Sequence, residues 1–294
     1  MPKKRFFSFI ISFFYAISFS ANALSIASWN LQWLTSQPIH HSKLKINKRS
    51  SSDFEQLATL FRQNDVDILA FQEVNDSPAI KKVVGNEYKL YLSDRSKPEW
   101  SRLQFKDINQ YTGFAVRKSL FITDPPDIQL IHKSQLRFAS YIVLRRTQKP
   151  DLHLLSVHLK SGCFGKWNPH KKACITLKKQ GVELNKWMKQ RIINHNDFAI
   201  LGDFNHNLSY PKDWLWRGIT HNLNHQPILS TKRTSADCRQ LNKRGKTFRY
   251  RHIIDHMITS DSVTISETHQ VPYPAKALKH YQLSDHCLLL GRLK

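Results

Sequence analysis

The sequence is poor in several residue types, and each shortage excludes a class of protein. With 9 glycines, 12 prolines and 40% hydrophobic residues among 294, the chain is neither fibrous nor disordered. Acidic residues are also scarce, 22 against 45 basic ones, which gives a formal net charge of +23. This imbalance disfavours a neutral cytosolic metabolic enzyme. It indicates a polyanionic partner, either nucleic acid or an anionic membrane surface.

Long apolar runs are absent except at the N-terminus. There, three basic residues and an apolar run over residues 3–20 precede the small residues Ala21-Asn22-Ala23. This pattern predicts a secretory signal peptide over residues 1–23, followed by a single domain over residues 24–294 in the secreted or periplasmic protein. An uncleaved anchor is less favoured because the run is shorter than the ~20 apolar residues that span a bilayer. After cleavage we expect no stable membrane anchor. Three basic and no acidic residues lie in this segment, so the remainder keeps a charge of +20.

The four cysteines all follow residue 23, and none has the C-x-x-C spacing of a zinc site. Disulfides are expected in secreted proteins. Cys163 and Cys174 flank a polar loop that a bridge could hold, so we predict a disulfide between them. Cys287 stands in an apolar run, where a buried free thiol is expected. Local sequence indicates no partner for Cys238, and reduced packing residues are the alternative for all four.

Hydrophobic patterning predicts alternating strands and helices. Ser51 or Ser52 can cap a helix in which Phe54, Leu57 and Phe61 share one face. The longest expected helix covers residues 174–194. Branched and aromatic runs predict strands at 25–29, 67–71, 113–116, 140–144, 152–157, 198–201, 253–258 and 287–293. No repeat, low-complexity tract or linker is visible, which favours one α/β domain.

Polar residues follow the ends of many of these strands. In α/β folds one rim of the sheet collects strand ends into a shared cleft. A single carboxylate in such a place can instead cap a helix or form a turn. Eight together favour a site: Asn30, Glu73, His158, Asp203, Asn205, Asp255, Asp285 and His286.

The residue types in this set suit one kind of chemistry. Carboxylate and amide oxygens are the ligands that Mg²⁺, Mn²⁺ and Ca²⁺ prefer, so we expect a divalent cation. Histidines and an aspartate beside such an ion can orient a phosphate and activate water. These are the parts that phosphodiester hydrolysis requires. A Ser-His-Asp hydrolase is less favoured because no serine lies in a Gly-x-Ser-x-Gly elbow.

An ordered series of short motifs resembles the endonuclease/exonuclease/phosphatase superfamily, typified by deoxyribonuclease I and the abasic-site endonucleases. The series runs from residue 25 to the C-terminus, and the complete order is more specific than any one motif. The resemblance implies a deoxyribonuclease I-like α/β (α+β) fold, a four-layered αββα sandwich with the active site at one end of two packed sheets. The motifs are Ser28-Trp29-Asn30-Leu31, Gln72-Glu73-Val74, Tyr111-Thr112-Gly113, Val157-His158-Leu159-Lys160, Gly202-Asp203-Phe204-Asn205, Ile254-Asp255-His256 and Ser284-Asp285-His286.

The resemblance also implies which residues hold the ion and the water. It makes Glu73 the main ligand of a divalent cation, Mg²⁺ or alternatively Mn²⁺ or Ca²⁺. Asn30 and Asp285 would help to hold the ion or its waters. Asp203 would position or deprotonate the attacking water, and Asn205 beside it would bind the phosphate.

The remaining matches concern the phosphate itself. His286 would contact the scissile phosphate, with Asp255 orienting its imidazole and keeping it charged. His158 matches a second histidine of the deoxyribonuclease-like branch. Tyr111 matches a phosphate-contacting tyrosine of the abasic-endonuclease branch, and Arg137 resembles an arginine that often reaches the same phosphate. For Tyr111 and Arg137, a place on the rim of the sheet is an equal alternative.

The distribution of charge bears on the substrate. Two basic sets flank the proposed catalytic residues and are expected to line the cleft; a solvated surface is the alternative. We predict substrate binding by Lys160, Arg244, Lys246, Arg249 and Arg251. The first set leads into Asp255 and comprises Lys232, Arg233, Arg239, Lys243, Arg244, Lys246, Arg249 and Arg251; the second follows His158 and comprises Lys160, Lys166, Lys171, Lys172, Lys178 and Lys179.

Together these observations predict a secreted metal-dependent phosphodiesterase, a largely nonspecific endonuclease that acts on DNA and, as a second candidate substrate, RNA. Phe164, Trp167, Phe248 and Tyr250 are interspersed with the basic residues and could stack on bases. No base-reading module is visible, so we expect weak sequence preference. Two alternatives stay open. A secreted sphingomyelinase-type phospholipase would normally add an apolar hairpin, and a non-enzymatic nucleic-acid-binding protein could use the same scaffold.

Overall fold

The computed structural model describes residues 23–37, 46 and 48–294. Apart from Ala23, the predicted signal peptide lies outside these residues. The described chain forms two six-stranded sheets and one two-stranded hairpin. Within the described ranges, the structure contains no helix with the length and hydropathy needed to cross a membrane.

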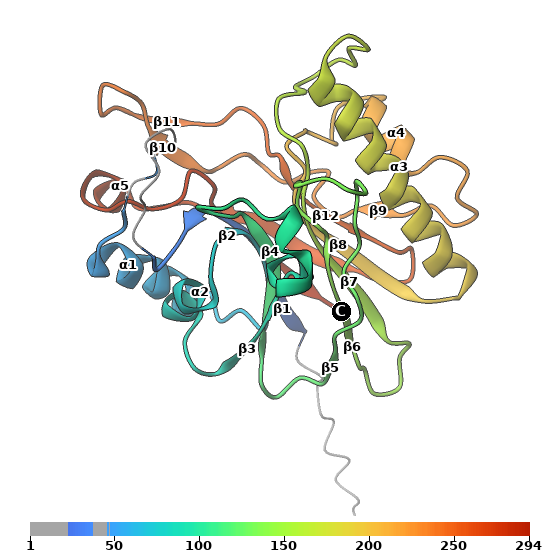
Figure 1. Ribbon diagram of the computed structural model, residues 1–294, viewed down its shortest axis with the longest axis horizontal. Helices are drawn as coiled ribbons and strands as arrows, with labels where there is room; N and C mark the ends of the chain where they lie inside the picture. Colours follow the sequence, from blue (N-terminus) through green and yellow to red (C-terminus); the bar gives the residue numbers. More distant parts are fainter. Residues whose placement is uncertain (1–22, 38–45, 47) are drawn as a thin grey trace, which may run out of the picture.

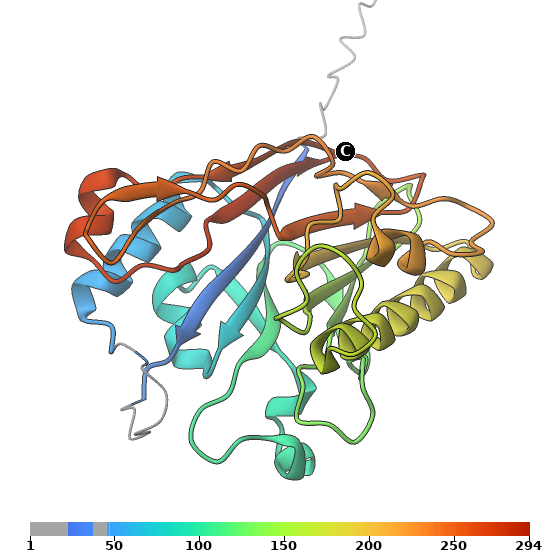
Figure 2. The ribbon, with the colours of Figure 1, turned by 90° about the horizontal axis from the view of Figure 1, so that it is seen from above.

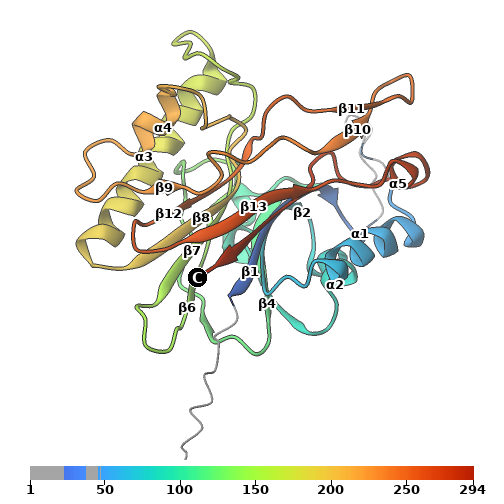
Figure 3. The same ribbon diagram turned by 180° about the vertical axis from the view of Figure 1, so that it is seen from behind.

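The first sheet has the strand order β13-β14-β1-β2-β4-β3, with helices on its outer face (Figures 1 and 2). β1 and β2 are parallel, whereas β14 pairs with β1 in the antiparallel direction, as the view from behind shows (Figure 3). The strands are β1 (Leu24–Leu34), β2 (Ile68–Val74), β3 (Tyr88–Leu92), β4 (Tyr111–Arg117), β13 (Ile265–Val271) and β14 (Leu288–Leu293), and the helices are α1 (Ser51–Gln63), α2 (Ser77–Val84) and α5 (Ala275–His280).

The second sheet has the order β5-β6-β7-β8-β12-β9 and is covered by α3 and α4 (Figure 1). Its strands are β5 (Ile122–Thr123), β6 (Ser140–Leu144), β7 (Leu152–His158), β8 (Asp197–Asp203), β9 (Ile228–Leu229) and β12 (Asp255–Thr259), with helices α3 (Lys172–Ile193) and α4 (Trp214–Ile219). The hairpin consists of β10 (Arg239–Leu241) and β11 (Thr247–Arg249), and 3₁₀ turns cover Asp94–Ser96 and Pro98–Leu103.

Alternating apolar side chains hold these layers together, because successive residues of a strand face opposite sides of a sheet. In β1, Ile26 packs between the two sheets, whereas Ala27 and Trp29 pack with the residues of α1 and α2. In β8, Leu201 faces the other sheet and Ile200 packs with the residues of α3 and α4. The result is the predicted four-layered αββα sandwich.

Several predicted boundaries need correction. The cap of α1 is Ser50, not Ser51 or Ser52: the Ser50 hydroxyl accepts from the Asp53 amide at 3.2 Å, and the Asp53 carboxylate accepts from the Ser50 amide at 2.7 Å. This reciprocal pair is a capping box, and it moves the helix start. Most strands run further than their apolar core, so Glu73, His158 and Asp203 occupy strand positions rather than loops.

The structure contains two disulfides. Cys163 bonds to Cys174, as predicted, at a sequence separation of 11. The expectation of a free thiol at Cys287 was wrong, because Cys287 bonds to Cys238 across 49 positions, with the Cα atoms 5.5 Å apart. Its apolar neighbours indicated burial correctly. Its partner, Cys238, lies in a distant segment that folds back over the first sheet. Local sequence cannot indicate which distant segment brings a cysteine close enough to bond.

Candidate active site

Three candidate residues lie side by side because their strands are neighbours. His158 and Asp203 are register partners in the parallel pair of β7 and β8. Asp255 is the partner of Asp203 in the antiparallel pair of β12 and β8. All three alternate in phase with residues that pack between the sheets, such as Leu154, Leu201 and Met257. Their side chains therefore meet at one end of the space between the two sheets.

Glu73 reaches the same place through an irregular backbone. Phe71 packs toward the helices. Side chains two residues apart in a regular strand face the same side of the sheet, so Glu73 would also point toward the helices and away from the site. Instead, Glu73 has φ 57°, and the pairing of β2 with β4 shifts register between Phe71 and Val74. Such a bulge re-aims a side chain. The Asn30 amide nitrogen lies 3.3 Å from the Glu73 carboxylate, and the Trp33 amide donates to the same carboxylate at 3.1 Å.

Asn30 joins the two halves of the site. Its side-chain nitrogen also donates to Asp203 at 3.1 Å, which links the first sheet to the second. Its side-chain oxygen accepts from the Gln32 amide at 3.0 Å. Asn30 therefore reaches the site as a donor to two carboxylates, and the expectation that it holds an ion or its waters stays a prediction.

Two histidines approach Asp203 from different sides. His158 Nε2 lies 3.5 Å from Asp203 Oδ2 and 3.6 Å from Glu73 Oε1. His286 Nε2 lies 3.7 Å from the same Asp203 oxygen, and its Nδ1 lies 2.8 Å from Asp255 Oδ2. A histidine held by a carboxylate at one nitrogen presents the other nitrogen to the site.

The environment gives these two imidazoles opposite charge preferences. Burial alone would lower the pKa of His286, but the charges of Asp255 and Asp203 outweigh it and raise the pKa well above its ordinary value. Burial lowers the pKa of His158 well below its ordinary value, and the positive charges of Arg137 and His286 add to this effect. His286 is therefore the charged imidazole and His158 the neutral one.

The positive charges near the carboxylates do not fully compensate their negative charge. Burial raises the pKa of Asp203 to about 7, and the nearby Asp255 adds to the shift. Burial also raises the pKa of Glu73, with a further contribution from the charge of Asp285. A divalent cation bound by Glu73 would relieve this cost, because oxygen ligands suit Mg²⁺, Mn²⁺ and Ca²⁺. The donor set therefore fits the predicted ion.

A second group of potential ligand atoms is less suitable for an ion. Asp203, Asp255 and His286 place one ligand atom each within 4.8 Å of one another. However, a histidine must be neutral to bind a metal, and the Asp255 carboxylate already holds the proton-bearing His286. We therefore expect an ion on the Glu73 side of Asp203.

Asn205 fixes the orientation of Asp203. It has φ 52°, a left-handed conformation that Asn tolerates better than most residues. Its backbone amide donates to Asp203 Oδ1 at 2.7 Å, and its side-chain nitrogen donates to Asp203 Oδ2 and to the Leu159 carbonyl, both at 3.1 Å. Its predicted contact with a phosphate stays a prediction.

Arg137 and Tyr111 differ in their surroundings. Arg137 donates to the Leu159 carbonyl at 3.0 Å and lies near enough to Glu73 and Asp203 for their charges to oppose the lowering of its pKa by burial. Its buried Nε has no hydrogen-bond partner among the described residues. The buried Tyr111 contacts Arg95, whose guanidinium lies 4.9 Å from the ring centroid. Phosphate contacts by Arg137 and Tyr111 stay predictions.

A cavity of about 360 Å³ adjoins the carboxylates. Asn205, Asp255, Asp285 and His286 line one side of it, and Phe164 and Tyr250 contribute aromatic rings. Tyr250 directly follows the β10–β11 hairpin, whereas Phe164 belongs to the loop closed by the Cys163–Cys174 disulfide. Residues of both basic segments of the sequence therefore line this cavity.

The predicted substrate-binding residues differ in how exposed they are and in the charges near them. Arg244, Lys246 and Arg251 are exposed in or directly after the hairpin. Arg249 forms an ion pair with Asp237 at 2.9 Å, so part of its charge is already compensated. Lys160 is partly buried, and its charge helps to lower the pKa of His158.

Sequence reasoning assigned no role to several residues that support the site. The Ser284 hydroxyl donates to the Asn30 carbonyl at 2.6 Å, and the Gln32 side chain accepts from the Asp285 amide at 3.1 Å. Between the sheets, the buried Gln72 donates to the Ser156 hydroxyl at 3.1 Å. Gln72 and Ser284 are members of two of the motifs named above, and this is the signal that could have indicated their supporting role.

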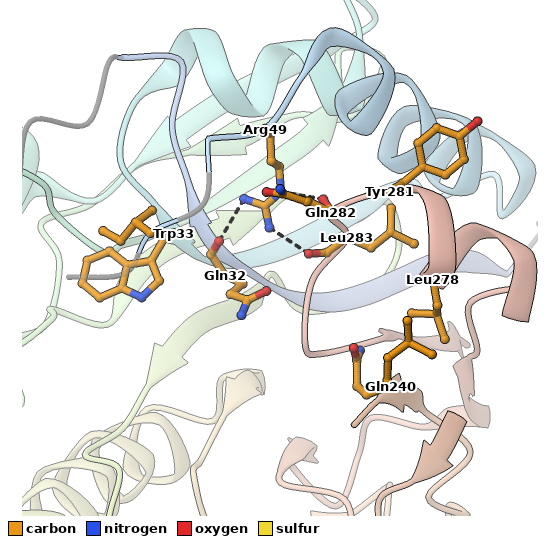
Figure 4. Close-up of a pocket in the computed structure, with 10 residues that line it drawn as sticks. Gln32, Trp33, Arg49, Gln240, Leu278, Tyr281, Gln282 and Leu283 are labelled. Atoms are coloured by element: carbon orange, nitrogen blue, oxygen red, sulfur yellow. Dashed lines mark hydrogen bonds between the residues drawn. The ribbon is translucent and has the colours of Figure 1, made fainter. Parts of the chain in front are cut away.

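Arg49 is a further support that the sequence did not reveal. Its guanidinium lies in a pocket of about 210 Å³ beside the segments that carry Asn30 and Asp285 (Figure 4). Burial lowers its pKa, and the charge of Asp53 opposes the shift. Arg49 connects the two segments because it donates four hydrogen bonds of 2.9–3.1 Å to the carbonyl groups of Leu31, Gln32, Gln282 and Leu283.

Solved structures resemble this fold at low sequence identity. An endonuclease/exonuclease/phosphatase from Bacteroides vulgatus is 14% identical, with a TM-score of 0.62 over 92% of this chain and 98% of that chain. A mannosyl-6-phosphatase from Bacteroides thetaiotaomicron is 15% identical, with a TM-score of 0.60 over 92% of this chain and 100% of that chain. A humanised TDP2 from D. rerio is 15% identical, with a TM-score of 0.59 over 92% and 98%.

The sequence itself matches one protein family. A comparison with curated proteins gives no significant match. The model of the endonuclease/exonuclease/phosphatase family, in contrast, matches residues 27–286, which include all of the carboxylates and both histidines described above. This chain therefore belongs to the endonuclease/exonuclease/phosphatase family.

Proposed function

We propose that this protein is a secreted, divalent-metal-dependent phosphodiesterase that cleaves nucleic acid as a largely nonspecific endonuclease, with DNA as the main substrate and RNA as a second one. Members of its family are usually hydrolases of phosphoester bonds. The observation that carries the proposal is the convergence of Glu73, Asp203 and a charged His286, which lines a cavity together with Phe164 and Tyr250 of the two basic segments.

The ion would be held mainly by Glu73, with Asp285 and Asn30 beside it. When bound, a divalent cation neutralises charge on the phosphoryl oxygens of the substrate. In this chain, the bulge at Glu73 and the hydrogen bonds from Asn30 and the Trp33 amide hold the carboxylate in position. Asp285 is held through its backbone by Gln32.

The protein residues would divide the proton transfers between them. Asp203 accepts the proton of the attacking water, and a pKa near 7 suits a base that works at neutral pH. Asn205 fixes that carboxylate through two contacts. His286, kept charged by Asp255, donates a hydrogen bond to the phosphate as charge develops on the oxygens and gives its proton to the departing oxygen.

Other residues would bind the phosphate without taking part in proton transfer. Burial favours the neutral form of His158. Its Nδ1 is buried and has no hydrogen-bond partner among the described residues, so Nε2 is the nitrogen that faces the site. Arg137 offers a buried donor near Glu73 and Asp203, which suits an anionic ligand. Asn205 and Tyr111 complete the proposed set of phosphate contacts.

The charge of the surface supports nucleic acid as the substrate. A repeating phosphate backbone binds basic residues along its length, and the hairpin presents Arg244, Lys246 and Arg251 to solvent. The two disulfides are typical of proteins in oxidising compartments, which supports secretion or a periplasmic location. We extend the proposal to a single catalytic domain over residues 24–294, after removal of residues 1–23.

The main rival is a sphingomyelinase-type phospholipase. The structure contains a hairpin, but its turn reads Asn242-Lys243-Arg244-Gly245, which is basic rather than apolar. Its aromatic residue Phe248 packs edge-to-face against Tyr250, with 5.3 Å between the ring centroids, and Tyr250 lines the active-site cavity. A basic turn followed by two aromatic rings suits a nucleic acid strand better than insertion into lipid.

Three substrates test the proposal in parallel. Purified protein is incubated with plasmid DNA, with RNA and with sphingomyelin liposomes, each in Mg²⁺ or in chelator. We expect plasmid nicking in Mg²⁺, slower or comparable RNA degradation, and no reaction in chelator. Hydrolysis of sphingomyelin without nicking would establish the rival, and binding of DNA without any cleavage would establish a non-enzymatic role.

A further inference from the structure

A second cavity lies beside the active site and has no role in the chemistry described above. It has a volume of about 470 Å³, within the range of about 300–1,000 Å³ that ligand pockets have. We call it the tryptophan pocket. Three aromatic and three basic residues define it: Trp167, Tyr210, Trp214, Lys166, Lys212 and Arg217.

The tryptophan pocket shares a rim with the active-site cavity. Phe164 lines the active-site cavity, and the next residue, Gly165, lines the tryptophan pocket. On the other side, the ring of Tyr210 contacts the ring of His252 at 5.2 Å, and His252 lines the active-site cavity. An extended ligand that leaves the active site can therefore enter the tryptophan pocket directly.

The walls of the pocket are fixed in place. Trp214 Nε1 donates to the Gly165 carbonyl at 2.9 Å, and the rings of Trp167 and Trp214 lie 5.1 Å apart. The Cys163–Cys174 disulfide closes the loop that carries Trp167. A preformed aromatic wall costs little ordering when a ligand binds.

The charge that faces the ligand is positive. Asp213 is the acidic residue of the lining, but it is buried, and its carboxylate contacts His206 at 2.6 Å and the Trp216 amide at 2.8 Å. Lys166, Lys212 and Arg217 are exposed. The pocket therefore combines aromatic faces with exposed cations, and an anion with a flat aromatic part complements both.

We propose that the tryptophan pocket binds a nucleobase of a single-stranded segment next to the scissile phosphate, with the flanking phosphates at Lys166, Lys212 and Arg217. This proposal rests on the proposed function, because the strand has to enter from the active site. Stacking on aromatic rings tolerates any base, which agrees with a nuclease of weak sequence preference.

Binding of a labelled oligonucleotide tests the pocket. A fluorescein-labelled single strand of about 12 nucleotides, near the upper end of single-strand site sizes, is titrated in chelator and followed by anisotropy. We expect Trp167→Ala to raise Kd about 10-fold, because stacking on one ring is lost. Trp167→Phe, which keeps an aromatic face, stays within about threefold. Lys212→Glu also raises Kd.

The matched control is Phe121→Ala. Phe121 is 79% exposed and directly precedes β5. β5 pairs with the last residues of β6, and these lie beside the first residues of β7. His158 is the last residue of β7, so Phe121 lies at the opposite end of the sheet from the active site. Its Kd should equal that of the wild type.

The outcomes separate this proposal from the proposed function. If the wild type nicks plasmid DNA but Trp167→Ala and Lys212→Glu bind the oligonucleotide as tightly as the wild type, the pocket proposal is wrong and the nuclease proposal stands. If the wild type neither binds nor cleaves, both are wrong. Should circular dichroism show that Trp167→Ala does not fold, Lys212→Glu and Tyr210→Ala, both at exposed positions, decide the question.

Discussion

At the scale of single residues, the candidate site depends on two histidines that meet one carboxylate and hold different charges. Asp203 lies within 3.7 Å of both imidazoles. His286 has Asp255 behind it, whereas His158 has the positive charges of Arg137 and Lys160 nearby. Buried charges and not the identity of the residue therefore decide which imidazole can donate a proton.

Replacing Asp255 with Asn should lower the pKa of His286. Without the Asp255 charge and hydrogen bond, less opposes the effect of burial, and the pKa of His286 falls. Activity that needs the charged form is lost as pH rises through this pKa, so the basic limb of the pH profile moves to lower pH. At neutral pH we expect activity to fall about 100-fold.

Nitrogen NMR of the histidine side chains in the metal-free protein measures this pKa directly. Asp237→Asn is the matched control, because Asp237 pairs with the exposed Arg249. An unchanged His286 pKa in Asp255→Asn would show that the pair is not responsible for the charge.

The sequence indicated the type of most site residues but not their orientation. Glu73 was identified beside the end of an apolar strand, yet only the backbone shows the φ of 57° that turns its carboxylate inward. Arg49 was missed because four carbonyl groups distant in sequence define its role. Backbone acceptors leave no trace in residue identity.

At the scale of secondary-structure elements, the parallel pair of β7 and β8 brings His158 next to Asp203. Gly202 permits this approach: it has φ 148°, and a Cβ there would lie 2.0 Å from the Val157 carbonyl oxygen. We expect Gly202→Ala to separate the two strands and to destabilise the fold by at least about 2 kcal/mol through overpacking and backbone strain.

Urea unfolding followed by circular dichroism measures the loss in Gly202→Ala. Gly218→Ala is the matched control, because a Cβ at this helical position has no atom within 4 Å. Equal midpoints for the two variants would contradict the assigned role of Gly202.

The Cys238–Cys287 disulfide ties the segment before the hairpin to the residue after His286. In the chain-entropy model, a loop of 49 positions contributes about 4 kcal/mol and one of 11 positions about 3 kcal/mol. We expect Cys238→Ala/Cys287→Ala to lose more stability than Cys163→Ala/Cys174→Ala in urea unfolding. It should also lose more activity on plasmid DNA, because Cys287 adjoins His286. The reverse order in both measurements would contradict this account.

Strongly apolar strands could be predicted, and polar or short ones could not. The bounds of β6 were predicted to the residue, because all five of its residues are buried. β11 is fully exposed and β9 has two residues, so neither has an apolar pattern. β13, at the edge of the first sheet, has five consecutive polar residues between Ile265 and Val271. Pairing with a neighbour, rather than intrinsic preference, forms these strands.

At the scale of the whole molecule, an acidic site lies within a strongly basic protein. A formal charge of +23 attracts polyanions over distances comparable to the screening length, about 8 Å at physiological salt. The sequence alone predicted an α/β domain with a polyanionic partner. The αββα arrangement was expected from the resemblance, because strand order depends on contacts between distant segments.

Binding of DNA should therefore weaken steeply with salt. The logarithm of the affinity for a single strand should fall with the logarithm of salt concentration by about 0.7 for each phosphate contacted. We expect Arg244→Ala and Lys246→Ala each to reduce this slope by about that amount, measured by anisotropy in chelator. Lys89→Ala, on β3 of the first sheet, is the control and should leave the slope unchanged. Affinity independent of salt would contradict an electrostatic interface.

The most direct test of the account compares Glu73→Gln with the wild type in a plasmid nicking assay, in Mg²⁺ and in chelator. Gln keeps the size and the hydrogen-bonding oxygen of Glu73 but removes its charge. We predict that the wild type nicks in Mg²⁺ and stops in chelator, and that Glu73→Gln, with an unchanged circular dichroism spectrum, is slower by at least about 100-fold. Wild-type nicking by Glu73→Gln, or nicking that persists in chelator, would contradict it.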